Sequence, residues 1–377
     1  PKPSSAASDV YKRQRIITDS TPRQSIRIDI GSVLLSSAGL VLIVFGMLQS
    51  KTWGWVVPLY TPEIAGVPIA PLGVSLTTWC IALGAALIAL FISWQRRLIR
   101  DGRSPLMQPD LFSITTLRSG LSVLGAQYAV TAGLFFMVPV YLQMTLGYDA
   151  LETGLKIFPL SVSLILFSIV GTALSRRWSP RRIVKVGQST LVLSAVLLLG
   201  AVTEDLRGVL FAAGMFLAGS ALGLLASQLG NVNMSSVGEK DTSEVGGLQG
   251  VFQNLGSSLG TALIGSLLIG ALSTSFASGV AVSDLPSDVR ETVSAATDRG
   301  VAVVPAADVA GIGEAAGLSD DDSSELADIY RESQLSSLRV SFVGLILISL
   351  LSILFSRGIP AHVSIRRRES AGAAERS

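Results

Sequence analysis

The chain has 377 residues and a mass of 39.5 kDa; 49% of its residues are hydrophobic, 15% are charged, and its mean hydropathy is +0.56. This composition is typical of a membrane protein and excludes a disordered chain, which needs few apolar residues and a high net charge. The 29 basic and 27 acidic side chains nearly cancel. Cys80 and His362 are the single cysteine and histidine, so no intrachain disulfide can form, and we predict no metal, no cofactor and no enzyme activity.

Residues 1–14 are polar and aperiodic, and we interpret them as a non-native leader; the alternative is a native basic arm. A membrane span needs about 20 consecutive apolar residues. Eight segments meet this requirement, at 30–50, 70–94, 119–143, 153–175, 183–203, 207–230, 246–272 and 338–356. Their long apolar runs do not alternate in polarity as a membrane β-barrel requires, so the sequence predicts an all-α integral membrane protein with eight transmembrane helices.

Basic residues flank these spans on one side. They precede the first span and follow the second and fourth: Arg23, Arg27, Arg96, Arg97, Arg100, Arg103, Arg176, Arg177, Arg181, Arg182 and Lys185. Because Lys and Arg are retained in the cytoplasm, we expect both termini there, together with the loop 95–118 and the tail 357–377. The basic residues are spread over several loops, which does not favour nucleic-acid binding.

The segment 273–337 is the largest predicted extramembrane region, and it carries twelve acidic residues against three arginines. Weak helical periodicity around 323–333 predicts a partly helical, extracytoplasmic acidic loop. An independent binding domain is the alternative, but the apolar residues here are mostly Ala and Val, which we expect to be too small for a convincing core.

The most informative motif reads YLQMTLGY at 141–148 and continues to Pro159. It resembles the signature of the major facilitator superfamily, in particular its fourteen-span drug:proton antiporter branch. Within the motif we expect Gly147 to permit a tight turn, Gly154 to allow close packing of the fourth span, and Pro159 to bend that span. Asp149 stands where the family more often has Ser or Thr.

Three more segments resemble this family in the same order along the chain: RIDIG at 27–31, SRRWSPRR at 175–182 and QNLGSSLGTA at 253–262. The resemblance covers about 25–360. It implies that 15–94 holds a linker segment and two extra helices, and that 119–356 is the C-terminal six-helix bundle. It further implies that the six N-terminal spans are missing from this chain, which would make it half of a transporter.

Polar side chains inside a bilayer tend to face a bundle interior or a cavity. On this basis we predict that substrate contacts come from Gln127, Tyr128, Tyr141, Gln143, Gln228, Asn231, Gln249, Gln253 and Asn254. The alternative for each amide is a hydrogen bond to a neighbouring helix. The set describes a mostly apolar cavity, which suits a bulky amphipathic substrate.

Gly256 and Gly260, like the pair Gly219 and Gly223, have helical spacing and predict close helix packing. The resemblance implies that Arg176, Arg177, Arg181 and Arg182 form a cytoplasmic latch; retention of positive charge on the inner side explains them equally well.

Proton coupling needs a buried titratable group, and the carboxylates of Asp29, Asp149 and Glu152 lie near span ends. Lys156 is expected to pair with Glu152 one helical turn earlier. We therefore expect the coupling acid in the missing half.

The sequence predicts a proton-coupled exporter of amphipathic drugs in a bacterial cytoplasmic membrane, since Arg outnumbers Lys 23 to 6 as in GC-rich genomes. Two alternatives stay open. One is a fragment that is inactive without the missing six spans. The other is a narrow-substrate metabolite exporter or symporter on the same fold.

Overall fold

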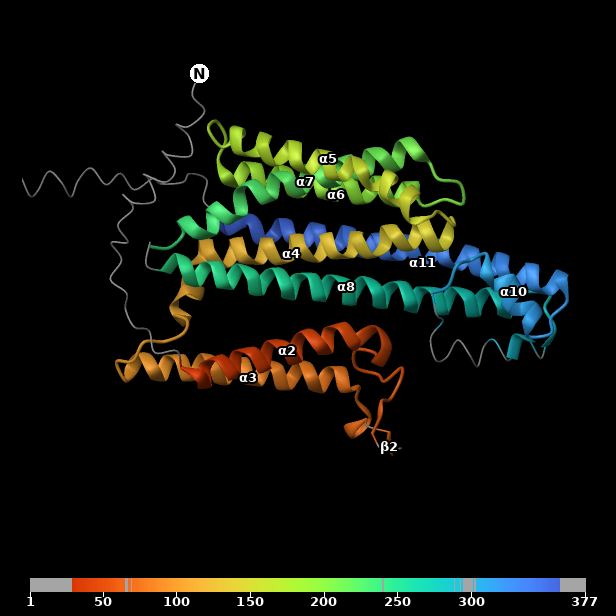
Figure 1. Cartoon of the computed structure of the whole chain (residues 1–377), viewed down its shortest axis with the longest axis horizontal. Coiled ribbons are helices and arrows are strands. Elements are labelled where there is room, and N and C mark those ends of the chain that lie inside the picture. Colours follow the sequence, from red (N-terminus) through yellow and green to blue (C-terminus); the bar gives the residue numbers. More distant parts are fainter. Residues whose placement is uncertain are drawn as a thin grey trace, which may run out of the picture.

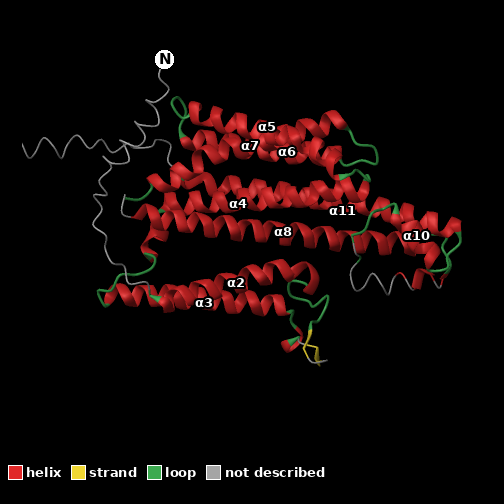
Figure 2. Ribbon diagram, viewed as in Figure 1, coloured by secondary structure: helices red, strands yellow, loops and turns green. Residues whose placement is uncertain are grey.

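The computed structural model of the protein describes residues 29–359 with gaps at 65–66, 69, 239–240, 288, 292, 294–300 and 302. Regular structure in this part of the chain is almost entirely helical (Figure 1, Figure 2). Eight of its helices are long and apolar enough to cross a membrane, which confirms the predicted all-α membrane fold. The leader 1–14 and most of the tail, His362 included, lie outside the described residues.

The eight long helices are α2 (Ile30–Trp53), α3 (Leu76–Arg100), α4 (Thr115–Pro139), α5 (Ala150–Leu174), α6 (Pro180–Ala201), α7 (Gly208–Ser235), α8 (Thr242–Ala281) and α11 (Asp320–Phe355). A π-helical turn, η3 (Val140–Thr145), extends α4. The short elements are β1 (Glu63–Ile64), β2 (Val67–Pro68), η1 (Pro71–Gly73), η2 (Pro109–Ser113), α10 (Asp308–Ala315) and η5 (Ser356–Gly358).

Side-chain caps fix where several helices begin. Asp29, Ser75, Ser179 and Ser319 each accept a backbone N–H from the first turn of α2, α3, α6 and α11. These bonds satisfy donors that a helix start otherwise leaves unpaired. The connection predicted at 95–118 is shorter in the structure, because α3 continues to Arg100 and α4 begins at Thr115. Arginine is a good helix former, so the helix outlasts the apolar run.

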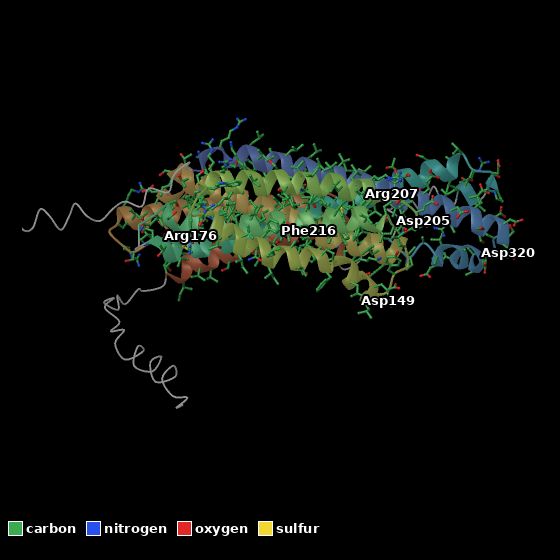
Figure 3. All side chains as sticks on the ribbon, turned by 90° about the horizontal axis from the view of Figure 1, so that it is seen from above. Asp149, Arg176, Asp205, Arg207, Phe216 and Asp320 are labelled. Atoms are coloured by element: carbon green, nitrogen blue, oxygen red, sulfur yellow. The ribbon has the colours of Figure 1, made fainter. Side chains whose placement is uncertain are left out.

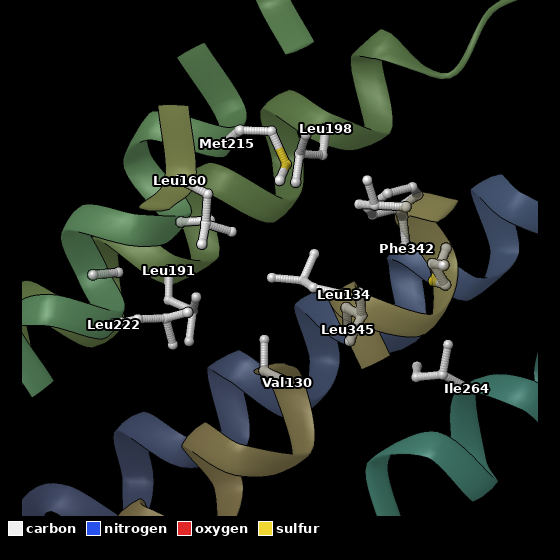
Figure 4. Close-up of a cluster of buried hydrophobic side chains, with 14 of the residues drawn as sticks. Val130, Leu134, Leu160, Leu191, Leu198, Met215, Leu222, Ile264, Phe342 and Leu345 are labelled. Carbon is white, nitrogen blue, oxygen red and sulfur yellow. The ribbon is translucent and has the colours of Figure 1, made fainter. Parts of the chain in front are cut away.

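Helices α4 to α8 and α11 form a six-helix bundle in which most main packing partners are not consecutive along the chain, α6 with α7 being the exception. α4 packs mainly against α8 and α11, whereas α7 packs mainly against α5 and α6. These two groups form separate layers in Figure 1, joined by contacts of α4 with α7 and of α6 with α11. Buried side chains from both layers fill the space between them, as Figure 4 shows: Val130, Leu134, Leu160, Leu191, Leu198, Met215, Leu222, Ile264, Phe342 and Leu345.

Two glycines of α7 set its distance from α5. A Cβ atom at Gly219 would lie 2.0 Å from the carbonyl oxygen of Leu160, and one at Gly223 would lie 2.5 Å from that of Leu164. No side chain fits at either position, so the two backbones are in direct contact, as expected of small residues between membrane helices.

Helices α2 and α3 form a hairpin that packs along α8 through α2 (Figure 1). Gly39 and Gly84 let the two helices approach closely, because a Cβ atom at Gly84 would lie 2.7 Å from the carbonyl oxygen of Gly39. The indole Nε1 of Trp55 donates to Ser266 Oγ of α8 at 3.0 Å. The hairpin is therefore docked on the bundle.

The two ends of the molecule differ in charge. Figure 3 places Arg176 at one end, which we call the basic end, and Asp149, Asp205 and Asp320 at the other, which we call the acidic end. Arg207 also lies at the acidic end.

The predicted acidic loop 273–337 is largely helical in the part that the structure describes. α8 continues to Ala281 and α11 begins at Asp320, with α10 beside it. Their apolar side chains form a separate core, which we call the cap: Leu272, Phe276, Val280, Leu285, Ala306, Val309, Leu326, Ala327 and Tyr330. The rings of Phe276 and Tyr330 meet edge to face at 5.4 Å. The expectation that this segment lacks a core is wrong, because the extensions of α8 and α11 bring Phe276, Leu326 and Tyr330 together with smaller apolar residues.

Candidate functional site

Among the predicted contacts on α4, Gln127 is buried, with 7% of its surface exposed. Its Oε1 atom has no hydrogen-bond partner, although Thr131 donates to its backbone carbonyl. An unpaired amide oxygen in an apolar interior is costly, so this group is available to a ligand or a water molecule. Tyr128 is half-buried and packs against the main core.

On α7 the buried amides are Gln228 and Asn233, whereas Asn231 is exposed. Gln228 Nε2 donates to the carbonyl oxygen of Gly171 at 3.1 Å and so bonds α7 to α5. Asn233 is fully buried, and neither its Oδ1 nor its Nδ2 has a partner. It lies against Gly120 of α4, where an added Cβ atom would be 1.9 Å from Asn233 Oδ1.

Asn233, which was not among the predicted contacts, is the buried amide near this end of α7, and the predicted Asn231 is exposed. Helical spacing on α7 could have identified Asn233. Leu229, Val232 and Asn233 share the buried face of Gln228, whereas Asn231 does not.

On α8, Gln249 and Gln253 share a face with Gly256 and Gly260 by helical spacing. That face meets α4, because Cβ atoms at the two glycines would lie about 2 Å from α4 carbonyl oxygens (2.2 Å at Gly256 and 2.1 Å at Gly260). Gln249 is half-buried and its Nε2 has no partner. Asn254 is exposed, and its Nδ2 donates to the carbonyl oxygen of Gly250 on its own helix at 2.9 Å.

Tyr141 and Gln143 belong to the π-helical turn η3. Tyr141 is 1% exposed, and its hydroxyl donates toward the carbonyl oxygens of Ala201 at 3.0 Å and Thr203 at 2.8 Å. The same hydroxyl accepts the Thr203 N–H at 3.2 Å. The structure therefore gives Tyr141 a packing role, fastening η3 to the connection between α6 and α7. Gln143 is half-buried.

The turn between η3 and α5, which contains the end of the motif, has a defined backbone shape. Gly147 has a φ of 72°, a left-handed conformation that glycine adopts without steric cost. Asp149 caps α5 and forms a reciprocal capping box with Glu152. The acid at position 149 thus serves the helix start as Ser or Thr would.

Two expectations for α5 are wrong. Nothing lies within 4 Å of a Cβ atom placed on Gly154, so this glycine faces outward and close packing comes from Gly219 and Gly223 of α7 instead. Glu152 does not pair with Lys156, because its carboxylate accepts the Asp149 N–H at 3.1 Å. The Lys156 ammonium lies over the Tyr148 ring instead, at 5.8 Å.

Pro159 lies inside α5. Its missing N–H leaves one carbonyl of the preceding turn without a helical partner, which is the usual origin of a helix bend.

The four arginines proposed as a latch lie at the basic end, two in the connection after α5 and two in the first turn of α6. Arg176, Arg177 and Arg182 are exposed, and Arg181 is half-buried with an unpaired Nε. The Arg182 guanidinium stacks over Trp178 at 4.4 Å. Within the described part of the chain, none of the four has an acidic side chain within salt-bridge distance.

The acidic end has an open groove of about 640 Å³. It is lined by Glu204, Asp321, Ser324, Glu325, Asp328, Ile329, Arg331 and Glu332. Arg331 pairs with Asp328 at 3.0 Å. No group of three or more His, Cys, Asp or Glu side chains suited to a metal ion is found in the residues that the structure describes.

Together, the buried polar side chains of the spans are amides and hydroxyls rather than charged groups. Gln127 and Gln249 keep unpaired polar atoms, and so does Asn233, while the carboxylates of the eight long helices lie near helix ends or in the cap. Such a weakly polar interior can accept groups by single hydrogen bonds and apolar contact.

The chain is similar in sequence to several named bacterial proteins. The chain is 23% identical over 276 residues to the probable actinorhodin transporter of Streptomyces coelicolor, which covers 72% of this chain and 44% of the relative. It is 26% identical over 334 residues to the tetracenomycin C resistance and export protein of Streptomyces glaucescens, covering 87% of this chain and 56% of that one. The multidrug resistance protein Stp of Mycobacterium tuberculosis is 23% identical, covering 68% and 44%. The chain thus spans about half the length of the curated relatives it matches.

A solved structure of a bacterial homologue of the human lysosomal transporter Spinster, inward-facing and occupied, covers 87% of this chain and 67% of its own. It is 18% identical, with a TM-score of 0.44. The sequence model of the protein family named Major Facilitator Superfamily matches residues 63–261, more than half of the chain. This protein is a multi-pass membrane protein and belongs to the Major Facilitator Superfamily of transporters.

Proposed function

We propose that the chain is part of a proton-coupled exporter that moves bulky amphipathic compounds out of a bacterial cell by alternating access. The observation that carries this proposal is the weakly polar interior of the bundle, where unpaired amide atoms on Gln127, Asn233 and Gln249 occur among apolar residues. A pocket with few directional groups tolerates many shapes. Two relatives are named for export or resistance, the tetracenomycin C resistance and export protein and the multidrug resistance protein Stp, and these names support outward transport.

The working protein, in this proposal, contains a second six-span half. Superfamily transporters bind substrate between two halves that rock about a central site. The chain spans about half of its curated relatives, and the spans described here carry acids only near helix ends and in the cap. We therefore assign the coupling acid to the other half, and this chain contributes one wall of the cavity. Both termini of the chain are proposed to be cytoplasmic.

Transport into inside-out vesicles tests the proposal. Uptake of a fluorescent lipophilic cation is measured with the chain alone and with the chain joined to an upstream six-span half. We expect uptake only from the joined protein, and a protonophore should abolish it. Uptake by the chain alone would contradict the need for a second half, and uptake that ignores the proton gradient would contradict proton coupling.

The amides can be tested in the same vesicles. Gln249→Leu removes an unpaired amide, whereas Asn254→Leu removes an exposed amide that bonds its own helix. We expect Gln249→Leu to change the relative uptake rates of dyes that differ in polar groups, and Asn254→Leu to leave them unchanged. Equal profiles for both variants would remove Gln249 from the cavity.

A narrow-substrate exporter is the second candidate, because two relatives are named for a single compound each, actinorhodin and tetracenomycin C. It predicts that unrelated amphipathic compounds do not compete with one another for uptake. Broad competition would favour the multidrug function.

A further inference from the structure

We propose that the connection 101–114 between α3 and α4 is a rigid strap, which fixes the α2–α3 hairpin to the first turns of α8. The hairpin and the six-helix bundle then move as one body. This inference is independent of the substrate and of the coupling ion.

On the hairpin side, a single amide joins three segments. Gln95 of α3 is fully buried, and its Nε2 donates to Ser32 Oγ of α2 at 2.6 Å. Its Oε1 accepts the backbone N–H groups of Leu106 at 2.7 Å and Met107 at 3.3 Å. Buried hydrogen bonds of this kind hold their partners in one arrangement, because breaking them leaves unpaired polar groups.

Asp29 extends this network to the start of α2. Its carboxylate accepts the Ser32 N–H at 3.2 Å and the indole N–H of Trp94 at 2.8 Å. The N-cap of one hairpin helix is thus bonded to the last turns of the other, beside Gln95.

On the bundle side, the strap bonds to the beginning of α8. The backbone N–H of Gln108 donates to Glu244 Oε2 at 2.9 Å, and its Nε2 donates to Asp241 Oδ1 at 3.3 Å. Asp241 immediately precedes α8 and Glu244 lies in its first turn. The strap therefore holds the same helix that carries Gln249 and Gln253.

Apolar packing reinforces these bonds. Leu111 of the strap, 4% exposed, forms a buried cluster with two residues of α4 and two of α8: Leu117, Leu121, Val245 and Leu248. Met107, Phe112 and Phe252 pack against it. A flexible linker would be rich in Gly and Ser and poor in such contacts.

Hydrogen exchange of the protein in detergent micelles tests the strap. Gln95→Leu removes the bonds to Ser32, Leu106 and Met107 without touching α8. We expect exchange to rise about tenfold both in the strap and in the first turns of α8, at 242–250. A rise confined to 95–107 would show that loosening the hairpin side of the strap does not loosen the first turns of α8, and would overturn the proposal.

Gln188→Leu is the matched control. Gln188 is 1% exposed and donates to Ser352 of α11, so its loss is equally disruptive but lies elsewhere in the bundle. We expect no change at 101–114 or 242–250. An equal rise there would mean that any loss of a buried amide loosens the whole bundle, which would also overturn the proposal.

Glu244→Ala is a second, reciprocal variant at a half-buried position, where folding is less at risk. It removes the acceptor of the Gln108 N–H. We expect faster exchange in the strap and in the last turns of α3, on the side away from the substitution. Unchanged exchange in the last turns of α3 would contradict a rigid strap.

Discussion

Gly260 shows how little room separates α8 from α4. A Cβ atom there would lie 2.1 Å from the carbonyl oxygen of Ala129, and backbone cannot move aside as a flexible side chain can. We expect Gly260→Ala to destabilise the protein by about 1–3 kcal/mol, the usual cost of overpacking. Thermal unfolding in detergent measures the loss.

The control for this prediction is Gly250→Ala on the same helix, where nothing lies within 4 Å of the added Cβ atom. Alanine favours a helix over glycine by about 1 kcal/mol, so this variant should be as stable as the parent or more stable. Equal losses in both variants would disprove the steric explanation.

A variant of Tyr141 can distinguish a packing role of this residue from a substrate-binding role. Tyr141→Phe keeps the ring against Phe211 but leaves the N–H of Thr203 without its acceptor. We expect unfolding to become easier by about 1–3 kcal/mol. Tyr128→Phe, at a half-buried position, is the comparison. If Tyr141→Phe alters transport selectivity at unchanged stability, Tyr141 contacts substrate instead.

Asp29 makes the stability of the hairpin depend on pH. Hydrogen bonds from Ser32 and then from Trp94 lower the pKa of this carboxyl below 3.8, its ordinary value. The stabilisation is therefore complete above about pH 3.8 and is lost as the pH falls through the lowered pKa. Melting temperatures of the parent should fall more steeply with acid than those of Asp29→Asn. Parallel profiles would exclude Asp29 as the titrating group.

For single residues, the sequence predicted the role correctly where that role depends on the residue's own backbone conformation. Gly147, predicted to permit a tight turn, has the left-handed backbone conformation that such a turn needs. The orientation of a side chain on its helix was less accessible. Gly154 faces outward and Asn233 faces inward, because which face is buried depends on partners that lie far away in the chain.

At the scale of elements, the cap is held by few residues. Phe276 is 7% exposed and meets Tyr330 at the centre of the cluster. Phe276→Ala should cost about 3–5 kcal/mol of local stability. Hydrogen exchange in α10 should then rise while exchange in α4 to α7 stays unchanged.

Ile312→Ala on α10 is the control, since Ile312 is 55% exposed. This variant should leave exchange in α10 close to that of the parent. Increased exchange across all helices in Phe276→Ala would show that the cap and the bundle unfold together, contrary to the separate core.

The number of spans was predictable from apolar runs, but the lengths of α8 and α11 were not. A run of high hydropathy indicates only the part of a helix inside the membrane. The helix itself can continue beyond the membrane where apolar residues at helical spacing pack against another element. Phe276 and Tyr330 supply that partnership across two helices. The π-helical turn η3, in which the Tyr141 hydroxyl bonds to Thr203, was not predicted from the sequence either.

At the scale of the whole molecule, the charges divide between the two ends (Figure 3). Because Lys and Arg are retained in the cytoplasm, we expect the basic end to be cytoplasmic. In a Cys80→Ser background, a cysteine replacing Asp205 should react with a membrane-impermeant maleimide added to whole cells. A cysteine replacing Arg176 should react only after the cells are opened. The reverse labelling pattern would invert the proposed orientation.

The family and the membrane class were accessible from the sequence, since the motif at 141–159 and the apolar runs are local. The pairing of helices was not. Gly219 and Gly223 predicted a close contact, but only the structure identifies α5 as the partner. Pairing depends on the complementarity of whole faces, which no local pattern contains.

The packing of α4 with α8 and α11, and of α7 with α5 and α6, has a consequence for biosynthesis. A ribosome delivers α4, α5 and α6 before any of their main partners exists. α5 and α6 gain theirs only when α7 emerges, and α4, with its buried Gln127, waits for α8. The order of insertion into the membrane therefore differs from the order of assembly. The face of α4 that later packs against α8 must therefore contact the translocation machinery or lipid until most of the chain has been made.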